Sequence, residues 1–525
     1  MTGRVHDTIV VGSGIGGLTA AALCAAEGRD VLVLEGHTRP GWCAGDFRRR
    51  RVLFPAGATV VMGFEEGGLH RWVYERLGLP MQARPRDLAM QVHLPDREVA
   101  VHADRDAWHV ELRRAFPERG ERGTRFWAHV ERLADVAHDL ASRRPVLPLQ
   151  TAADALANLH LVRPSLLRAT PALPALWQSV GDLLRASRVD GYVPLRTFVD
   201  NQLLISMQCG ADECVALSGA LALEVYRYGT FELPAGPATI AADLVGALER
   251  RGGSIRYHAW VRQLEPSADG WIATTADGDT FAARTIVANL PSENVAGLLA
   301  PALRQGPGRP RHDHQQPWGA VVLNAALDPT GLPGRLPRYH QVVQRYDGAL
   351  EDGGSCFVSL FGPEDGQPGG PARLSVSTHT RVGPWWGLRD RPAYLEQKSI
   401  LGERLLTAAE VAIPDVRARV RFAEVATPRT FWRWTGRHEG RVGGFAQTRT
   451  QANLLAPSHR THLPGLVLCG DAVFPGQGTI GVTLSGIIAA RATARHLDAS
   501  RRRAWIAMPV LDRARWLGSQ QDIGR

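Results

Sequence analysis

The stretch from Ile9 to Glu35 constrains the fold of this chain more than any other part. It opens with the apolar, β-branched run Thr8–Val11, which predicts a buried strand. Gly12, Gly14 and Gly17 then form the pattern G-x-G-x-x-G, and an Ala- and Leu-rich helix follows. A second apolar run leads to an acid at the end of the stretch. A strand, a glycine turn, a helix and a strand that ends in an acid predict a dinucleotide-binding βαβ unit.

Each of these residues has a physical role in such a unit. Gly12 permits the tight turn from strand to helix, Gly14 lets the backbone approach a pyrophosphate, and Gly17 lets the helix pack on the sheet. The carboxylate of Glu35 can accept hydrogen bonds from ribose hydroxyls. The alternative is a glycine-rich turn that packs tightly and binds nothing. The pattern by itself does not separate FAD from NAD.

Composition argues against several classes of protein. The chain has 525 residues, 44% of them hydrophobic. That is enough for a large core and, by length, for about three domains. The net charge is +9, but nearly all of the positive charge is arginine, with Lys398 as the lysine. No arginine-rich segment is interleaved with aromatic residues, so a nucleic-acid interface is not expected. A basic chain can still be attracted to anionic lipid head groups.

The cysteines and histidines do not predict a disulfide framework or a metal site. The six cysteines are scattered without a C-x-x-C pair, which indicates reduced thiols in a cytoplasmic protein. His93, His102 and His109 have no accompanying cluster of carboxylates or cysteines. The N-terminus leads directly into the first strand, so no signal peptide is expected. No apolar run reaches the ~18 residues of a spanning helix, and any membrane contact is expected at the surface.

A second stretch, residues 466–490, complements the first. A buried strand is followed by Gly470-Asp471, a Phe-Pro-Gly-Gln-Gly loop and a helix that begins near Ile480. The carboxylate of such a Gly-Asp pair can bind ribityl hydroxyls. The free N–H groups and positive dipole of the helix N-terminus can face the pyrimidine oxygen of a flavin. Together with the N-terminal pattern, this stretch favours a flavin dinucleotide.

Three shorter features have more than one interpretation. Arg39 precedes a tight turn, where it either reaches a pyrophosphate or makes no cofactor contact, and the basic run at 48–51 is typical of a solvated hairpin. The apolar residues around Gly57 suggest that the chain passes close to another backbone or a ring. Asp200-Asn201-Gln202 is a polar cluster in an apolar helix, and it faces either solvent or a buried ligand.

Two segments are candidates for contact with lipid. Residues 149–186 are rich in Leu, Ala and Pro, and their short helices can line an apolar pocket, dip into a membrane face or pack in a core. The tail from Arg491 is basic and amphipathic, as at a lipid surface or in a solvated final helix.

The pattern between these segments predicts a discontinuous two-domain α/β fold. An amphipathic helix at 239–251 precedes short strands at 254–288, and alternating apolar runs between 318 and 378 suggest an antiparallel sheet in a second domain. The expected division is a dinucleotide-binding domain of residues 1–85, 232–300 and 455–525 and a substrate domain of residues 86–231 and 301–454.

Over nearly its whole length, the chain resembles the phytoene-desaturase-like flavoproteins, a branch of the amine-oxidase and glutathione-reductase superfamily. The resemblance is carried by G-S-G-I-G-G with Glu35, by the segment Thr427–Gly444, and by C-G-D-A-V-F-P-G-Q-G-T-I-G-V-T-L-S-G. The loop Phe474–Gly478 is similar to that of the carotenoid-isomerase and carotenoid 3,4-desaturase subgroup. One departure is Trp42, where the family usually has a second glycine after Pro-Gly.

Three further segments favour the 3,4-desaturase side of that subgroup. These are A-G-A-T at Ala56–Thr59, G-F-E-E-G-G-L-H at Gly63–His70, and the later segment F-V-D-N-Q-L-L.

The resemblance implies a Rossmann-like fold of the glutathione-reductase type, with FAD along the first domain and a mixed sheet-plus-helix substrate domain. It implies phosphate contacts for the glycine turn, a ribose contact for Glu35, an adenine contact for Val261 and a ribityl contact for Asp471. Thr479 and Ile480 are then expected near the isoalloxazine ring. The residues expected to bind FAD are Gly12, Ser13, Gly14, Ile15, Gly16, Gly17, Glu35, Arg39, Gly57, Val261, Gly470, Asp471, Gly478, Thr479 and Ile480.

The implied activity is the C-3,4 desaturation of an acyclic or hydroxylated carotenoid by hydride transfer to FAD. Loss of hydride from an allylic carbon leaves a delocalised cation whose adjacent proton is acidic, so no strong base is required. Asp200 is the candidate for a polar catalytic group at the ring. The alternatives are an FAD-dependent carotenoid cis–trans isomerase or saturase and a non-enzymatic lipid carrier of the GDP-dissociation-inhibitor type. The expected partners are a hydrophobic polyene and a peripheral membrane surface, without nucleic acid or metal.

Overall fold

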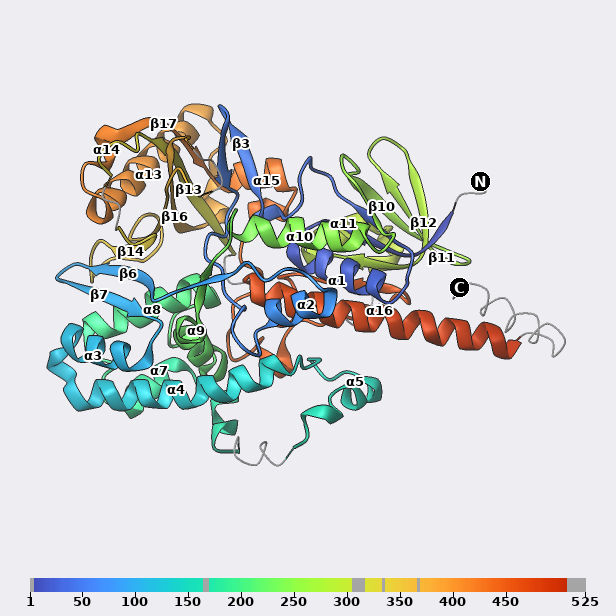
Figure 1. The fold of residues 1–525 in the computed structure, drawn as a ribbon, viewed down its shortest axis with the longest axis horizontal. Coiled ribbons are helices and arrows are strands. Elements are labelled where there is room, and N and C mark those ends of the chain that lie inside the picture. Colours follow the sequence, from blue (N-terminus) through green and yellow to red (C-terminus); the bar gives the residue numbers. More distant parts are fainter. Residues whose placement is uncertain (1–3, 164–169, 305–316, 333–335, 366–368, 508–525) are drawn as a thin grey trace.

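The computed structural model describes residues 4–163, 170–304, 317–332, 336–365 and 369–507. Within these residues the chain forms two seven-stranded sheets and a group of helices beneath the second sheet in the view of Figure 1. The part of the basic tail beyond residue 507 lies outside the described residues.

The first sheet contains the strands that the N-terminal pattern predicts. Strand β1 pairs in parallel with β2 and β12, and β12 also pairs in parallel with β18. The hairpin strands β10 and β11 extend the sheet beyond β12 in antiparallel fashion, and β9 closes the other edge. The bounds are β1 Val5–Val11, β2 Val31–Leu34, β9 Ser254–Arg256, β10 Val261–Ser267, β11 Gly270–Thr275, β12 Thr280–Ala288 and β18 Leu466–Leu468.

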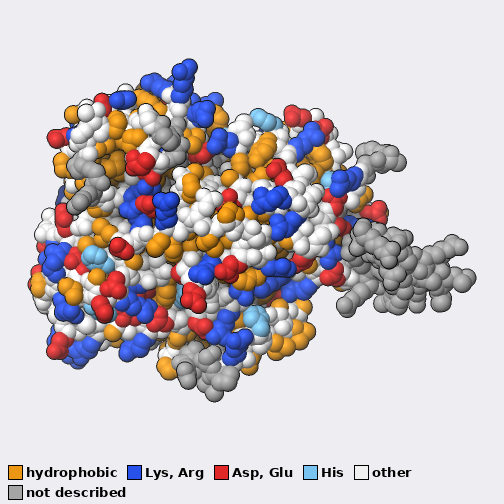
Figure 2. All heavy atoms as spheres, in the orientation of Figure 1, with side chains coloured by type: hydrophobic (Ala, Val, Ile, Leu, Met, Phe, Trp, Pro, Cys, Tyr) orange, Lys and Arg blue, Asp and Glu red, His pale blue; other side chains and the backbone are white. Residues whose placement is uncertain are grey.

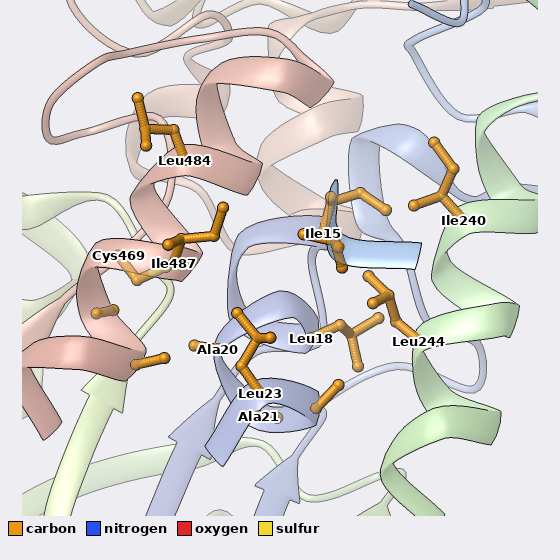
Figure 3. Packing of buried hydrophobic residues seen from close by; sticks show 14 of the residues in the cluster. Ile15, Leu18, Ala20, Ala21, Leu23, Ile240, Leu244, Cys469, Leu484 and Ile487 are labelled. Atoms are coloured by element: carbon orange, nitrogen blue, oxygen red, sulfur yellow. The ribbon is translucent and has the colours of Figure 1, made fainter. Parts of the chain in front are cut away.

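Helix α1 (Ile15–Ala26) packs between α10 (Pro237–Glu249) and α16 (Thr479–Ala507) at the first sheet. Figure 3 shows Leu18 of α1 in one buried cluster with Leu244 of α10, and Ile487 of α16 belongs to the same cluster. Burial of each such side chain contributes roughly 1.5–3 kcal/mol. The last long helix of the chain is therefore part of the same core as the first.

The second sheet has the strand order β17-β13-β16-β15-β14-β6-β7. It is antiparallel except between β14 and β6. The bounds are β6 Leu88–Leu94, β7 Arg97–His102, β13 Trp318–Leu327, β14 Tyr339–Val343, β15 Ser355–Phe361, β16 Ala372–Arg381 and β17 Val420–Ala426.

The two faces of this second sheet have different environments. Because side chains alternate along a strand, Val321 and Leu323 of β13 pack in the cluster that contains Leu401 of helix α13 (Arg391–Ala412). Val322, which lies between them in sequence, lines a cavity on the opposite face. The sheet therefore separates a helix-covered core from the cavity.

Helices α4, α8 and α9 contribute residues to the cavity wall, and α3 and α7 pack against them. Trp108 and Trp127 form their aromatic core with ring centroids 5.0 Å apart, and Phe198 stacks on Trp108. The bounds are α2 Leu69–Leu77, α3 Arg105–Ala115, α4 Gly120–Ser142, α5 Ala152–Ala157, α7 Val180–Ala186, α8 Val193–Met207 and α9 Ala216–Tyr228. The remaining elements are α11 Ser292–Leu298, α12 Val382–Gly387, α14 Val416–Arg419, α15 Pro428–Thr435, β3 Asp46–Arg49, β4 Val52–Pro55, β5 Arg84–Arg86 and β8 Thr230–Glu232.

The predicted two-domain α/β fold is confirmed. Strands of the first sheet come from residues 5–34, 254–288 and 466–468, and those of the second come from residues 88–102 and 318–426. The exact domain boundaries remain a prediction.

The surface has no single dominant charge on the face shown. Figure 2 shows basic and acidic side chains interspersed over it, so the positive net charge is not gathered there into one stripe. Of the helices in the described residues, none combines the length and apolar character needed to cross a membrane.

Candidate active site

A cavity of about 1360 Å³ lies between the two sheets. At one end it is lined by the glycine turn before α1. At the other end it is lined by inward-facing residues of β13, β15 and β16 and by helix α9. The cavity therefore connects the predicted dinucleotide site with the second sheet.

The glycine turn offers bare backbone to the cavity. Gly12 has a φ of +92°, and a Cβ atom on Gly14 would fall 2.7 Å from Nδ2 of Asn289. Gly14 is the N-cap of α1, and no side chain caps this helix end. The first N–H groups of α1 are thus available to an anion, which also gains from the positive end of the helix dipole. This cradle fits the phosphates of a dinucleotide.

The second predicted stretch borders the same cavity. Asp471 follows β18, and its Oδ2 accepts a hydrogen bond from Nη2 of Arg437 at 2.8 Å. Both residues line the cavity, together with Gly470, Gly478, Thr479 and Ile480. The two stretches expected to hold opposite ends of a flavin dinucleotide are therefore brought together.

Comparisons with known proteins agree with this arrangement. Residues 10–77 match the family of NAD(P)-binding Rossmann-like domains. The chain is 27% identical to the chloroplastic prolycopene isomerase of Daucus carota, over 97% of this chain and 83% of that protein. It is 24% identical to a lycopene-forming phytoene desaturase of a Paracoccus species, over 93% of this chain and 96% of that protein. The predicted resemblance to the carotenoid-desaturase-like flavoproteins is thereby confirmed.

Two further similarities concern part of the chain and its fold. Human all-trans-retinol 13,14-reductase is 26% identical over 49% of this chain and 42% of that protein. A solved structure of a putrescine oxidase with redesigned cofactor binding aligns with a TM-score of 0.60 at 14% identity, covering 94% of this chain and 99% of that one. The predictions of an enzyme, of an oxidoreductase and of FAD as its cofactor are confirmed for this flavoprotein. The non-enzymatic lipid carrier is therefore set aside.

The structure changes the interpretation of Glu35. This carboxylate is fully buried and is not among the residues that line the cavity. Its Oε2 accepts hydrogen bonds from the N–H of Ser13 at 2.8 Å, from Oγ of Ser13 and from Nε1 of Trp42, both at 2.5 Å. Its Oε1 accepts from the N–H of His37 at 2.7 Å. Trp42 lines the cavity, and we infer that its indole must move before a ribose hydroxyl can reach Glu35.

We expect the Trp42→Gly variant to bind FAD about tenfold more tightly than the natural chain. The indole N–H competes with ribose for Glu35, and one hydrogen bond to a charged group contributes about 1.5 kcal/mol. Trp42 also has a φ of +50°, which glycine adopts without strain. Fluorescence titration of the apoprotein with FAD measures the dissociation constant. The exposed Trp177 gives a matched control, Trp177→Gly, which should leave it unchanged. Weaker FAD binding by Trp42→Gly would contradict this account.

Arg39 does not reach the cavity, which corrects the expectation that it contacts the cofactor. Its Nε lies 2.5 Å from Oδ1 of Asp46, and nearly half of its side chain is exposed. The arginines that line the cavity are Arg262, Arg433 and Arg437, and the last two lie in the segment that the resemblance highlighted without singling out either residue.

The other predicted contacts divide into two groups. Gly57 and Val261 line the cavity, as do Ile15 and Gly16. Ser13 and Gly17 belong to the same turn but are not among the lining residues. The contacts of all these residues with FAD remain predictions.

Asp200 is not the polar group at the ring. Its Oδ2 accepts from Nε of Arg196 at 2.6 Å, and its Oδ1 accepts from the N–H of Ala211 at 2.7 Å. Asp200 does not line the cavity. It links the middle of α8 to the turn after that helix. The prediction of a catalytic role is therefore wrong, because both carboxylate oxygens are used for structural contacts.

Sequence reasoning missed three polar residues in the cavity wall, Gln208, His379 and Gln477. Gln477 lies in the Phe-Pro-Gly-Gln-Gly loop, so that motif offered a signal. His379 lies on β16 among the alternate side chains that face the cavity. That pattern indicates a site only once the arrangement of the sheet is known. Gln208 ends α8 with a φ of +61°, and nothing local to it indicates a site.

Proposed function

We propose that this flavoprotein acts on a carotenoid and that its reaction is C-3,4 desaturation of an acyclic or hydroxylated substrate. The observation that carries the proposal is the continuity of the dinucleotide cradle with an apolar chamber in one cavity. Leu217, Leu221 and Val225 of α9 line that chamber opposite Val322 and Phe357 of the second sheet. FAD, when bound, supplies a hydride acceptor.

The chain's own residues then have three tasks. The apolar walls bind the polyene, with a gain of roughly 0.8 kcal/mol for each CH₂ group removed from water. They also exclude water from the reacting carbons. The glycine turn and the Arg437–Asp471 pair would hold the cofactor so that its ring end meets the chamber. No lining carboxylate is required as a strong base, since the proton beside a delocalised cation is acidic.

A second candidate is cis–trans isomerisation of a carotenoid. It is favoured by the similarity to prolycopene isomerases, which extends over 97% of the chain. A saturase is a third candidate. It has less support, because the similarity to a retinol reductase is confined to 49% of the chain.

Product analysis separates these reactions. FAD-loaded protein is incubated with an acyclic carotenoid, in one reaction with an electron acceptor and in a parallel reaction with a reductant of the flavin, and products are resolved by chromatography with absorbance and mass detection. Desaturation predicts a longer chromophore and the loss of two hydrogens. Unchanged mass with altered geometry would establish the isomerase instead, and added hydrogens would establish the saturase. Failure of the polyene to bind at all would reject a carotenoid substrate.

We also propose that the enzyme meets a lipid surface through residues 149–163 and 170–177. Leu156, Leu159 and Trp177 are 60–66% exposed in this segment, which is unusual for large apolar side chains. Flotation of the protein with anionic vesicles tests the idea. Recovery of all of the protein in the bottom fraction, at low as well as at physiological salt, would reject it.

A further inference from the structure

Three polar side chains from distant parts of the chain meet in the wall of the cavity. Gln208 ends α8, His379 lies on β16, and Gln477 lies in the loop before α16. Nε2 of Gln208 lies 2.9 Å from Oε1 of Gln477 and 3.2 Å from Nε2 of His379. They form a polar cluster, which we call the amide–imidazole cluster, beside the mostly apolar chamber.

Hydrogen bonding fixes the orientation of every group in this cluster. Nε2 of Gln477 donates to the backbone carbonyl oxygen of Ile205 at 3.0 Å. The Oε1 of Gln477 therefore faces Gln208 and must accept from the Gln208 amide nitrogen. That same nitrogen has a second hydrogen, and it can only donate to Nε2 of His379. A neutral His379 consequently carries its proton on Nδ1.

One strong hydrogen-bond acceptor in this cluster, the side-chain carbonyl oxygen of Gln208, has no donor. Gln208 is only 5% exposed, and its Oε1 is buried without a hydrogen-bond partner among the described residues. Leaving a buried carbonyl oxygen unpaired is costly, so the site is better suited to a ligand or water that donates a hydrogen bond. The backbone leaves room for the pair of amides, since a Cβ atom on Gly443 would overlap both of them.

The cluster is also uncharged near neutral pH. Burial, with a smaller effect of the positive charge on Arg381, lowers the pKa of His379 to about 4. The Arg381 guanidinium itself stacks on the ring of Trp318, 3.4 Å from its centroid. The cluster thus presents a neutral carbonyl acceptor and a neutral imidazole that carries an N–H group. A hydroxyl group can donate to the carbonyl oxygen of Gln208, whereas a carboxylate offers no donor to it.

We propose that Gln208, His379 and Gln477 form a binding subsite for an uncharged hydroxyl group of the polyene substrate. The subsite rests on the proposed function, because it specifies which carotenoids the chamber prefers. Gln208 would accept from the hydroxyl, and Gln477 and His379 would hold its amide in the required orientation.

The test compares two ligands that differ by one hydroxyl group. FAD-loaded protein is titrated with an acyclic C40 polyene and with its monohydroxylated derivative, and the quenching of tryptophan fluorescence gives both dissociation constants. We expect the natural chain to bind the alcohol about tenfold more tightly than the hydrocarbon, as for one buried hydrogen bond. Gln208→Met should reduce this ratio to about one while the hydrocarbon affinity changes less than threefold.

A second variant and a control keep the result interpretable. Gln477→Met leaves α8 intact but frees the Gln208 amide, so it should also lower the ratio if Gln208→Met folds poorly. Gln447→Met is the matched control, since Gln447 lines the same cavity but donates to the carbonyl oxygen of Pro475 instead. It should keep the tenfold ratio.

Three outcomes would overturn the subsite. One is an unchanged ratio in both Gln208→Met and Gln477→Met, which would mean that water alone occupies the cluster. Another is a change in FAD affinity and flavin absorbance without a change in the ratio, because the cluster would then contact the flavin. The third is failure of both polyenes to bind the natural chain, which would reject the proposed function together with the subsite.

Discussion

The Gly17→Ala variant is expected to lose its bound FAD, with affinity reduced on the order of a hundredfold. A Cβ atom at this position would overlap the carbonyl oxygen of Gly12 and would lie 2.9 Å from Cβ of Asn289. The first obstacle is backbone, so α1 can relieve the overlap only by moving away from the turn. Overpacking of this kind costs about 1–3 kcal/mol, and here it also displaces the N–H groups expected to bind phosphate.

The absorbance of flavin in the purified protein measures this loss directly. Gly123→Ala is the matched control, because Gly123 lies in helix α4 with its nearest contact 4.0 Å away. That substitution should retain FAD and leave the thermal midpoint unchanged or slightly raised, since alanine favours helix over glycine. Full flavin content in Gly17→Ala would show that α1 does not depend on close contact with the turn.

Replacing Arg437 with leucine is expected to lower the free energy of unfolding by about 3 kcal/mol and to weaken FAD binding. The side chains of Arg437 and Asp471 are only 15% and 19% exposed, so the substitution leaves a mostly buried carboxylate without its cation. Urea denaturation of the FAD-free protein gives the stability change separately from any effect of the cofactor. The exposed pair Arg345–Asp347 offers the control, since Arg345→Leu should cost less than about 1 kcal/mol.

A double variant distinguishes the ion pair from a simple packing defect. If the unpaired charge causes the loss, Arg437→Leu combined with Asp471→Leu should recover much of the stability. Equal destabilisation by Arg437→Leu and Arg345→Leu would refute the importance of the buried pair.

The sequence predicted those parts of the fold that depend on local pattern. The apolar run before Gly12 and the alternation of 318–327 each identify a strand, because period and side-chain shape decide between strand and helix. The parallel pairing of β14 with β6 joins segments far apart in the chain, and no local pattern encodes it. The cavity between the sheets depends on such long-range pairing, so its wall could not be predicted residue by residue.

The misplaced site residues have specific physical causes. Asp200 and Arg196 are four residues apart in one helix, a spacing that already favours an ion pair over a ligand contact. For Glu35, the ribose contact remains a prediction, and the structure shows protein partners that the sequence did not indicate. Trp42 was noted as a departure from the family pattern, yet its bond to Glu35 depends on a left-handed backbone that the sequence does not reveal.

The C-terminal elements complete the first sheet, and this determines when the first domain can assemble during synthesis. Strand β18 pairs with β12, and helix α16 packs on α1, yet both come from the C-terminal part of the chain. Until the ribosome has translated these elements, β12 lacks its partner β18, and the side of α1 that packs on α16 is exposed to solvent. The core around α1 can therefore close only after β18 and α16 have been synthesised, and a nascent chain must shield that apolar surface until then.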